Sequence, residues 1–251
     1  MRPKIVESVT PYTITQTLIT DCSFVSSLTV TALYERTFRK KLITSIIYPQ
    51  NAHGQPIVNS SGKYVVKLFV NGCFRKVEID DNLPVSKTGQ LLCSHSKDEN
   101  EFWVSLLEKA FLKVMGGYDF PGSTSCEDLH VLTGWIPERF GFHDDGIYNK
   151  YIQLDNYLFV YSFVYLFICL FVFGELNVER LFSRLESGQE YGDCLITIAT
   201  KEMSDEEADS LGLVSSHAYA VLRAVQLGTH RFLLIKNPWA QKRWKGIFIN
   251  I

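Results

Sequence analysis

The chain has 251 residues, of which 46% are hydrophobic and 13% aromatic. That much apolar surface supports a core in one large domain or two small ones, and it excludes general disorder. The 25 lysines and arginines nearly balance the 27 aspartates and glutamates. Since no strong field draws the chain to nucleic acid, we predict no nucleic-acid partner.

Six cysteines are scattered along the chain with no CxxC pair. The first residues also lack the charged-then-apolar pattern of a secretory signal. We therefore expect a reducing, cytoplasmic setting, in which a thiol stays free.

The first predicted element is a helix that begins at Cys22. Apolar residues spaced by three and four follow Asp21-Cys22-Ser23, namely Phe24, Val25, Leu28 and Ala32. This spacing predicts an apolar stripe on one helix face. A helix N-terminus lowers the pKa of a thiol through its free N–H groups and its dipole. A lone cysteine is nevertheless more often a small buried hydrophobe, so its placement alone does not define a nucleophile.

Gln16 precedes Cys22 by six residues. Its side-chain amide could donate, together with the N–H of Cys22, to an oxyanion that develops during acyl transfer.

Residues 64–80 alternate apolar and polar side chains around Asn71-Gly72, which predicts a hairpin with a type I′ turn. Residues 101–115 predict a second helix, closed by Gly116-Gly117.

Residues 157–173 form an apolar run of 17 residues without a charge, a proline or a glycine. That length lies at the lower edge of a membrane span. The alternatives are a buried helix or strand pair, membrane contact, and a segment foreign to the domain. We do not favour membrane contact, because a span would place Cys22 and His217 on opposite sides of the bilayer.

The C-terminal part contains short β-rich runs at 195–200, 217–225 and 231–237. His217 opens the second run and Asn237 ends the third, so two antiparallel strands can bring both side chains together. The asparagine oxygen can accept a hydrogen bond from the imidazole, and Trp239 can shield that bond from water. The order Cys22, His217, Asn237 predicts a nucleophilic triad in an α+β protein, with the site between two lobes.

Four blocks of sequence, in this order, resemble the signature blocks of the calpain protease core, most closely in its atypical PalB-type branch. They are QTLITDCSF (16–24), GGYDFPGSTSCEDLHVLTGWIPERF (116–140), SHAYAVL (216–222) and KNPWAQKRWKG (236–246). The resemblance implies a papain-like two-lobed cysteine protease core with a helical first lobe and an antiparallel β second lobe.

By this resemblance Cys22, His217 and Asn237 are the catalytic residues, Gln16 is an oxyanion donor and Trp239 is the shield. Two positions depart from most calpains. Ser23 stands where most members have tryptophan, which alters the local wall of the cleft. Thr20 replaces a usual glycine, which stiffens the approach to the oxyanion site.

We predict a first lobe at 1–145, an apolar insertion at 146–178 and an incomplete second lobe at 179–251. We expect the chain to be truncated at both ends of the core. His217 follows Cys22 by 195 residues, compared with roughly 130 to 150 in the papain type. We interpret the extra length as read-through of non-coding sequence or an unusual splice form, and we expect it to reduce solubility.

No histidine or cysteine has metal-ligand spacing, so we assign no metal and no cofactor. Calcium enters only through the family resemblance. The acidic run Asp205-Glu206-Glu207 is better explained as the first turn of a solvated helix. The resemblance implies protein substrates, and full-length relatives with extra domains for endosomal-sorting partners.

Two functions remain open. The first is an intracellular calpain-type cysteine endopeptidase, which hydrolyses peptide bonds through an acyl-enzyme. The second is an inactive calpain-like isoform or binding module with a disrupted core. Transglutaminase-like chemistry is a distant third, because Asn237 occupies the third position.

Overall fold

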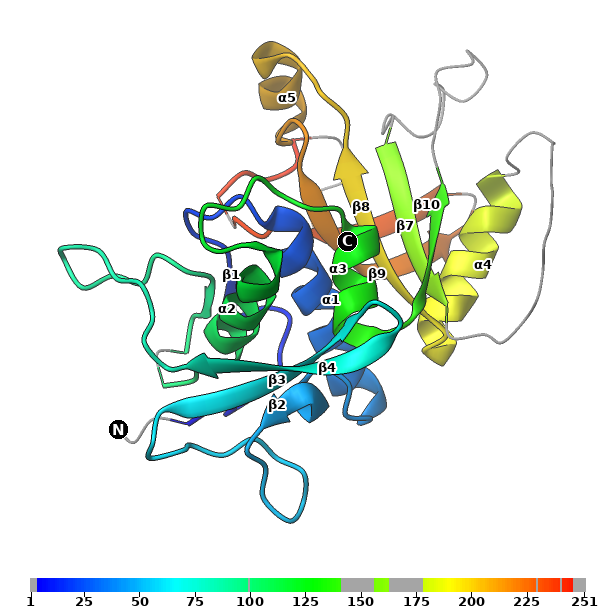
Figure 1. The fold of residues 1–251 in the computed structure, drawn as a ribbon. Coiled ribbons are helices and arrows are strands. Elements are labelled where there is room, and N and C mark those ends of the chain that lie inside the picture. Colours follow the sequence, from blue (N-terminus) through cyan, green and yellow to red (C-terminus); the bar gives the residue numbers. More distant parts are fainter. Residues whose placement is uncertain are drawn as a thin grey trace.

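A buried helix, α1 (Cys22–Phe38), runs between two groups of secondary-structure elements (Figure 1). The computed structural model describes residues 4–98, 100–140, 156–162, 178–228, 230–239 and 241–245. The other helices are α2 (Trp103–Met115), α3 (Ser125–Thr133), α4 (Val178–Tyr191), α5 (Asp205–Leu211) and the 3₁₀ turn η1 (Thr44–Ile46).

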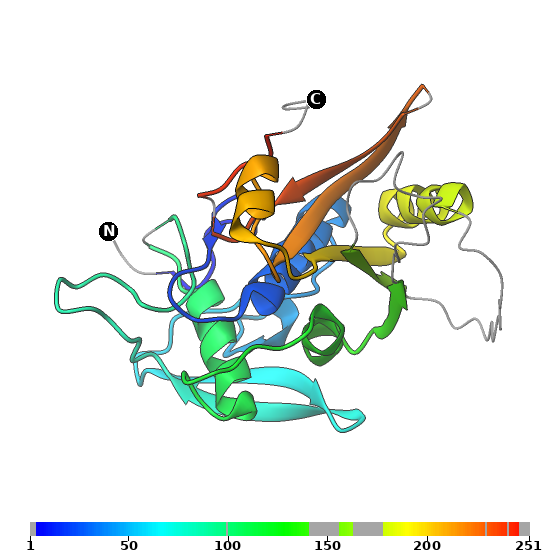
Figure 2. The same ribbon diagram turned by 90° about the horizontal axis from the view of Figure 1, so that it is seen from above.

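Three antiparallel sheets accompany these helices. A pair joins β1 (Ile14–Thr15) and β5 (His95–Ser96). A three-stranded sheet has the order β2 (Ile47–Tyr48), β3 (Lys63–Val70), β4 (Cys73–Asp80). A five-stranded sheet has the order β10 (His230–Lys236), β9 (Ala218–Leu227), β8 (Cys194–Thr200), β7 (Asn156–Ser162), β6 (Ile136–Phe140). Helices α1 and α2 lie beside the β3–β4 hairpin, and the larger sheet lies on the other side of α1 (Figures 1 and 2). The fold therefore belongs to the mixed α+β class that the sequence predicted.

The β3–β4 hairpin turns at the predicted dipeptide. Asn71 and Gly72 both have positive φ, at 52° and 77°, as a type I′ turn requires. Val70 pairs with Cys73 directly across the turn. Helix α2 ends at Met115 with Gly116 in a left-handed conformation, as predicted. Val114 is 39% exposed because it lies in the last turn, beyond the packed part of α2.

The first part of helix α1 is buried on every side rather than along one stripe. Each residue from Ser23 to Ala32 is buried, the serines and threonines included. Several hydroxyls are satisfied within the helix: Ser27, Thr29 and Thr31 each donate to the carbonyl four residues earlier, at 2.8 to 3.0 Å. Since bonded hydroxyls cost little to bury, the polar face of α1 can pack against protein.

The two lobes use different parts of α1. Phe24, Val25 and Leu28 belong to the core of the first lobe. Val30, further along the helix, packs with Leu195 of β8 and Ala220 of β9. The neighbouring residues Ile196 and Val221 point to the opposite sheet face and pack with α4. Successive strand residues alternate faces, so α1 and α4 cover opposite faces of the five-stranded sheet.

Strand β7 lies within the range predicted as an insertion. Its backbone pairs with β6 on one side and with β8 on the other. Residues 146–155 and 163–177 lie outside the described residues, so the boundaries of the insertion stay a prediction. Among the helices of the described residues, none combines the length and apolar character needed to cross a bilayer.

The first-lobe core makes a stability prediction. Phe111 of α2 is fully buried and stacks on Phe24 of α1, with ring centroids 4.1 Å apart. We expect Phe111→Ala to lower the free energy of unfolding in urea by about 3–5 kcal/mol, because it leaves a cavity. Phe74→Ala is the control, since Phe74 is 53% exposed, and should cost less than about 1 kcal/mol. Equal losses in both variants would contradict this packing.

Candidate active site

Cys22 is the first residue of α1, as the sequence predicted. Asp21 precedes it as the N-cap residue and makes no side-chain capping bond. The first intrahelical bond runs from the N–H of Val25 to the carbonyl of Asp21, at 3.0 Å. The N–H groups of the first turn lack intrahelical acceptors, and Cys22 lies among them.

His217 and Asn237 meet at one end of the larger sheet. Strands β9 and β10 pair antiparallel, with Ala220 opposite Lys236, so the residue before one strand lies near the residue after the other. His217 Nε2 lies 2.9 Å from Asn237 Oδ1. This contact confirms the predicted geometry. We assign the proton to Nε2, which donates to the asparagine oxygen and leaves Nδ1 as an acceptor.

The backbone of His217 is fixed by Thr200, the last residue of β8. His217 N–H donates to Thr200 Oγ1 at 2.9 Å, and Thr200 N–H donates to the His217 carbonyl, also at 2.9 Å. Thr200 was not predicted to belong to the site. Its position at the end of the β-rich run 195–200 is the only sequence signal for it.

Aromatic rings enclose the imidazole. The ring of Trp239 lies 4.6 Å from that of His217, and the ring of Tyr219 lies edge-on at 5.0 Å. Trp239 N–H also donates to Asn237 Oδ1 at 3.0 Å. Trp239 therefore lies beside the His217–Asn237 hydrogen bond, in a position to shield that bond from water.

A hydrogen bond joins the first turns of α1 to the N-terminal end of β9. Ala218, the residue after His217, accepts a hydrogen bond from Ser26 Oγ of α1 at 3.1 Å. The backbone of Ala218 also lowers the pKa of the Cys22 thiol, against the larger effect of burial. The candidate nucleophile and the residue next to the candidate base are therefore electrostatically coupled.

Burial favours the uncharged forms of both groups. It raises the pKa of the Cys22 thiol, although hydrogen bonds from the N–H groups of Ala218 and Ser23 act in the opposite direction. It lowers the pKa of His217 to about 4, although the Asn237 bond acts against it. Our expectation that the helix N-terminus lowers the pKa of Cys22 is therefore wrong for this structure, because desolvation outweighs the helix contribution.

Gln16 is buried next to Cys22, but its amide is engaged. Its Nε2 donates to the Ile19 carbonyl at 2.7 Å and to Asp21 Oδ1 at 3.3 Å. To donate to an oxyanion, the Gln16 amide must therefore give up one of these two hydrogen bonds.

Asp21 and Glu108 are both fully buried. Desolvation raises the pKa of both carboxyl groups.

Ser23, which departs from the calpain pattern, forms part of a polar chain. Its Oγ lies 3.0 Å from Ser123 Oγ, and Ser123 donates to Asp128 Oδ2 at 2.8 Å. Burial raises the pKa of Asp128 to about 7. A serine thus links the first turn of α1 to α3 at the position where most calpains carry tryptophan.

The described residues contain no group of three or more histidine, cysteine, aspartate or glutamate side chains that could hold a metal ion. Asp205, Glu206 and Glu207 form the first turn of α5, and Ser204 caps that helix. This confirms the predicted explanation of the acidic run.

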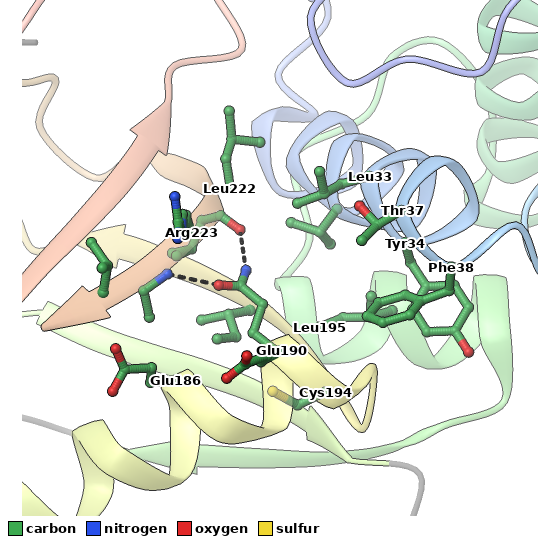
Figure 3. A pocket seen from close by; sticks show the side chains of 16 residues that line it. Leu33, Tyr34, Thr37, Phe38, Glu186, Glu190, Cys194, Leu195, Leu222 and Arg223 are labelled. Carbon is green, nitrogen blue, oxygen red and sulfur yellow. Dashed lines mark hydrogen bonds between the residues drawn. The ribbon is translucent and has the colours of Figure 1, made fainter. Parts of the chain in front are cut away.

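A cavity of about 370 Å³ lies away from this site, between α1, α4, β8 and β9 (Figure 3). Gln189 of α4 forms part of its wall and bonds the backbone of β9 in both directions, as donor to the Val221 carbonyl and as acceptor from the Ala224 N–H. The α1 residues that line the cavity run from Val30 to Phe38. Cys22 lies at the other end of the helix.

Comparison with known proteins identifies the family of this chain. Residues 2–250 match the model of the calpain family cysteine protease domain. The chain belongs to the calpain family of cysteine proteases.

Its relatives include calpain-7 of Mus musculus, 49% identical over 97% of this chain and 27% of the relative, and calpain-7 of Homo sapiens, 48% identical over the same shares. The calpain-like protease palB/RIM13 of Aspergillus oryzae is 41% identical over 90% of this chain and 23% of the relative. The chain spans about a quarter of the length of these curated relatives, so they carry further domains.

The electrostatics of the site predict how Cys22 reacts with iodoacetamide. Only the thiolate reacts, and burial raises the pKa of the Cys22 thiol. The alkylation rate at Cys22, followed by peptide mass spectrometry, should therefore keep rising with pH between pH 7 and 9. A rate that is already constant between pH 6 and 8 would show a preformed thiolate and contradict the assignment.

Proposed function

We propose that this chain is the catalytic core of a calpain-type cysteine endopeptidase, with Cys22 as nucleophile, His217 as general base and Asn237 as the residue that orients the base. The observation that carries the proposal is the His217–Asn237 hydrogen bond of 2.9 Å, beside a strand end that Ser26 of the Cys22 helix bonds at Ala218. The family assignment supports the protease class.

Acylation begins with two neutral groups. His217 Nδ1 takes the proton of the thiol as Cys22 Sγ attacks the carbonyl carbon of a peptide bond, and an imidazolium and a tetrahedral oxyanion form together. The N–H of Cys22 and the amide of Gln16 donate to the oxyanion. The imidazolium then gives its proton to the leaving amine, the C–N bond breaks, and a thioester remains on Cys22.

Deacylation repeats these steps with water. Neutral His217 removes a proton from the water that attacks the thioester carbonyl, and the imidazolium returns a proton to the Cys22 sulfur as the C–S bond breaks. The products are a carboxylic acid and the free thiol. Throughout, Asn237 holds the imidazole in one tautomer, and the ring of Trp239 limits the access of water to that bond.

The substrates we propose are proteins, and the setting is the cytoplasm. Five cysteines among the described residues are free thiols, including the exposed Cys73, which supports a reducing compartment. The additional length of the relatives supports further domains in the whole protein, for which we propose endosomal-sorting partners.

An inactive calpain-like chain is the second candidate. The observation that favours it is the apolar range 146–178, whose strand β7 lies between β6 and β8. A segment that disturbs the second lobe would displace His217 and Asn237 from Cys22. Labelling with a peptidyl electrophile separates the two candidates, because only an assembled site reacts selectively at Cys22.

The endopeptidase proposal predicts the effects of two substitutions on the hydrolysis of an unfolded protein substrate. Cys22→Ser should lower kcat/KM by about 10³-fold or more, because it removes the nucleophile. Asn237→Ala should lower it less, by roughly 10- to 100-fold, because the base remains but loses its orientation. Cys73→Ser is the matched control and should have no effect. Hydrolysis by Cys22→Ser at the wild-type rate would refute the mechanism.

The insertion hypothesis makes a separate prediction. Deletion of residues 146–178 should raise the soluble fraction on expression, because it removes a long apolar aromatic run. The comparison is made between the two chains expressed side by side, with electrophile labelling of Cys22 as a second measurement. If the full chain is soluble and labels as fast as the deletion variant, the segment belongs to the fold.

A further inference from the structure

Two hydrogen bonds connect the segment that carries Asn237 to the strand that leads to Gln16. Lys236 Nζ, from the end of β10, donates to the carbonyl of Ile14 in β1 at 2.7 Å. The N–H of Gln16 donates to the carbonyl of Pro238 at 3.1 Å. The residues on either side of Asn237 are therefore both bonded to the first lobe.

The pairing aligns the two halves of the candidate site. Lys236 contacts Ile14, and Pro238 contacts Gln16, so two residues in each segment meet in matching order. Asn237, between them, holds His217. Gln16, at the end of the other segment, holds the loop before Cys22 through Ile19 and Asp21. A shift of one segment along the other would separate the base from the nucleophile.

The position of Lys236 is energetically unfavourable for a charged side chain. The side chain is partly buried, and within the described residues no carboxylate forms an ion pair with it. Burial lowers its pKa to about 8, and repulsion from Lys97 acts in the same direction. A buried cation without a counter-charge destabilises a fold, and an apolar residue of similar size is often tolerated better. The folding energy therefore does not explain why a lysine stands here.

We propose that Lys236 is a positioning residue that joins the two lobes by bonding the Ile14 carbonyl, and that this bond keeps Asn237 and His217 in register with Gln16 and Cys22. The proposal deepens the proposed function, because its kinetic part rests on the endopeptidase activity. Its structural part concerns the Gln16–Pro238 bond and can be measured without turnover.

The test compares Lys236→Met, Lys236→Arg and Lys113→Met in the full chain. Lys113 Nζ also donates to a carbonyl, that of Glu78 at 2.6 Å, but both residues belong to the first lobe. Three quantities are measured: the exchange rate of the Gln16 N–H in deuterated water, the free energy of unfolding, and kcat and KM for one fluorogenic peptide.

We expect Lys236→Met to speed exchange at the Gln16 N–H at least about fivefold and to lower kcat about tenfold, with KM within about twofold of wild type. The free energy of unfolding should stay the same or rise. Lys236→Arg, which keeps a charged donor, should restore both values, and Lys113→Met should leave them unchanged. A purely structural lysine would instead lower stability and change kcat only through unfolding.

The proposal is overturned if Lys236→Met leaves either the Gln16 exchange rate or kcat at the level of Lys113→Met, or if its loss of kcat follows a loss of stability. If the wild-type chain shows no turnover, the proposed function fails, and the Gln16 exchange rate alone then decides whether Lys236 joins the lobes.

Discussion

The hydrogen bond between His217 and Asn237 depends on the burial of α1, because this helix is the surface on which both lobes pack. Phe24 and Leu28 place the first-lobe core against the helix, while Val30 anchors the five-stranded sheet. Ser26 then bonds the Ala218 carbonyl directly beside His217. The first turn of α1 carries Cys22, so the helix that organises both cores also carries the proposed nucleophile. The same helix, α1, therefore supports the packing of both lobes and positions the candidate site.

Burial disfavours the charged forms of the groups at the candidate site. It raises the pKa of the Cys22 thiol and lowers that of His217, and it raises the pKa of the Asp21 and Glu108 carboxyl groups. A higher carboxyl pKa favours thiolate formation, because a negative charge beside the thiol would oppose it. In the proposed mechanism, charge is therefore created only when substrate is present and the Cys22 N–H and the Gln16 amide can stabilise it.

The sequence was sufficient for the parts of the fold that follow from local pattern. Asn71-Gly72 predicted the hairpin turn, Gly116 predicted the end of α2, and the strand ends at His217 and Asn237 predicted their contact. Properties that depend on tertiary packing could not be predicted in this way. Periodicity gave α1 a single apolar stripe, because the i−4 bonds that make its hydroxyls cheap to bury carry no sequence signal. The contacts of Thr200 and Lys236, and the raised pKa of Cys22, likewise exist only once the lobes are packed together.

The most direct test of the account is a crystal structure of the chain after reaction with a peptidyl chloromethyl ketone. We predict a thioether bond at Cys22 Sγ, the inhibitor carbonyl oxygen within hydrogen-bond distance of the Cys22 N–H and the Gln16 amide, and His217 still bonded to Asn237. Gln16 Nε2 should have left Ile19 or Asp21 to reach the inhibitor. A structure with the inhibitor on another cysteine, or with His217 and Asn237 apart while Cys22 is modified, would contradict the assembled site.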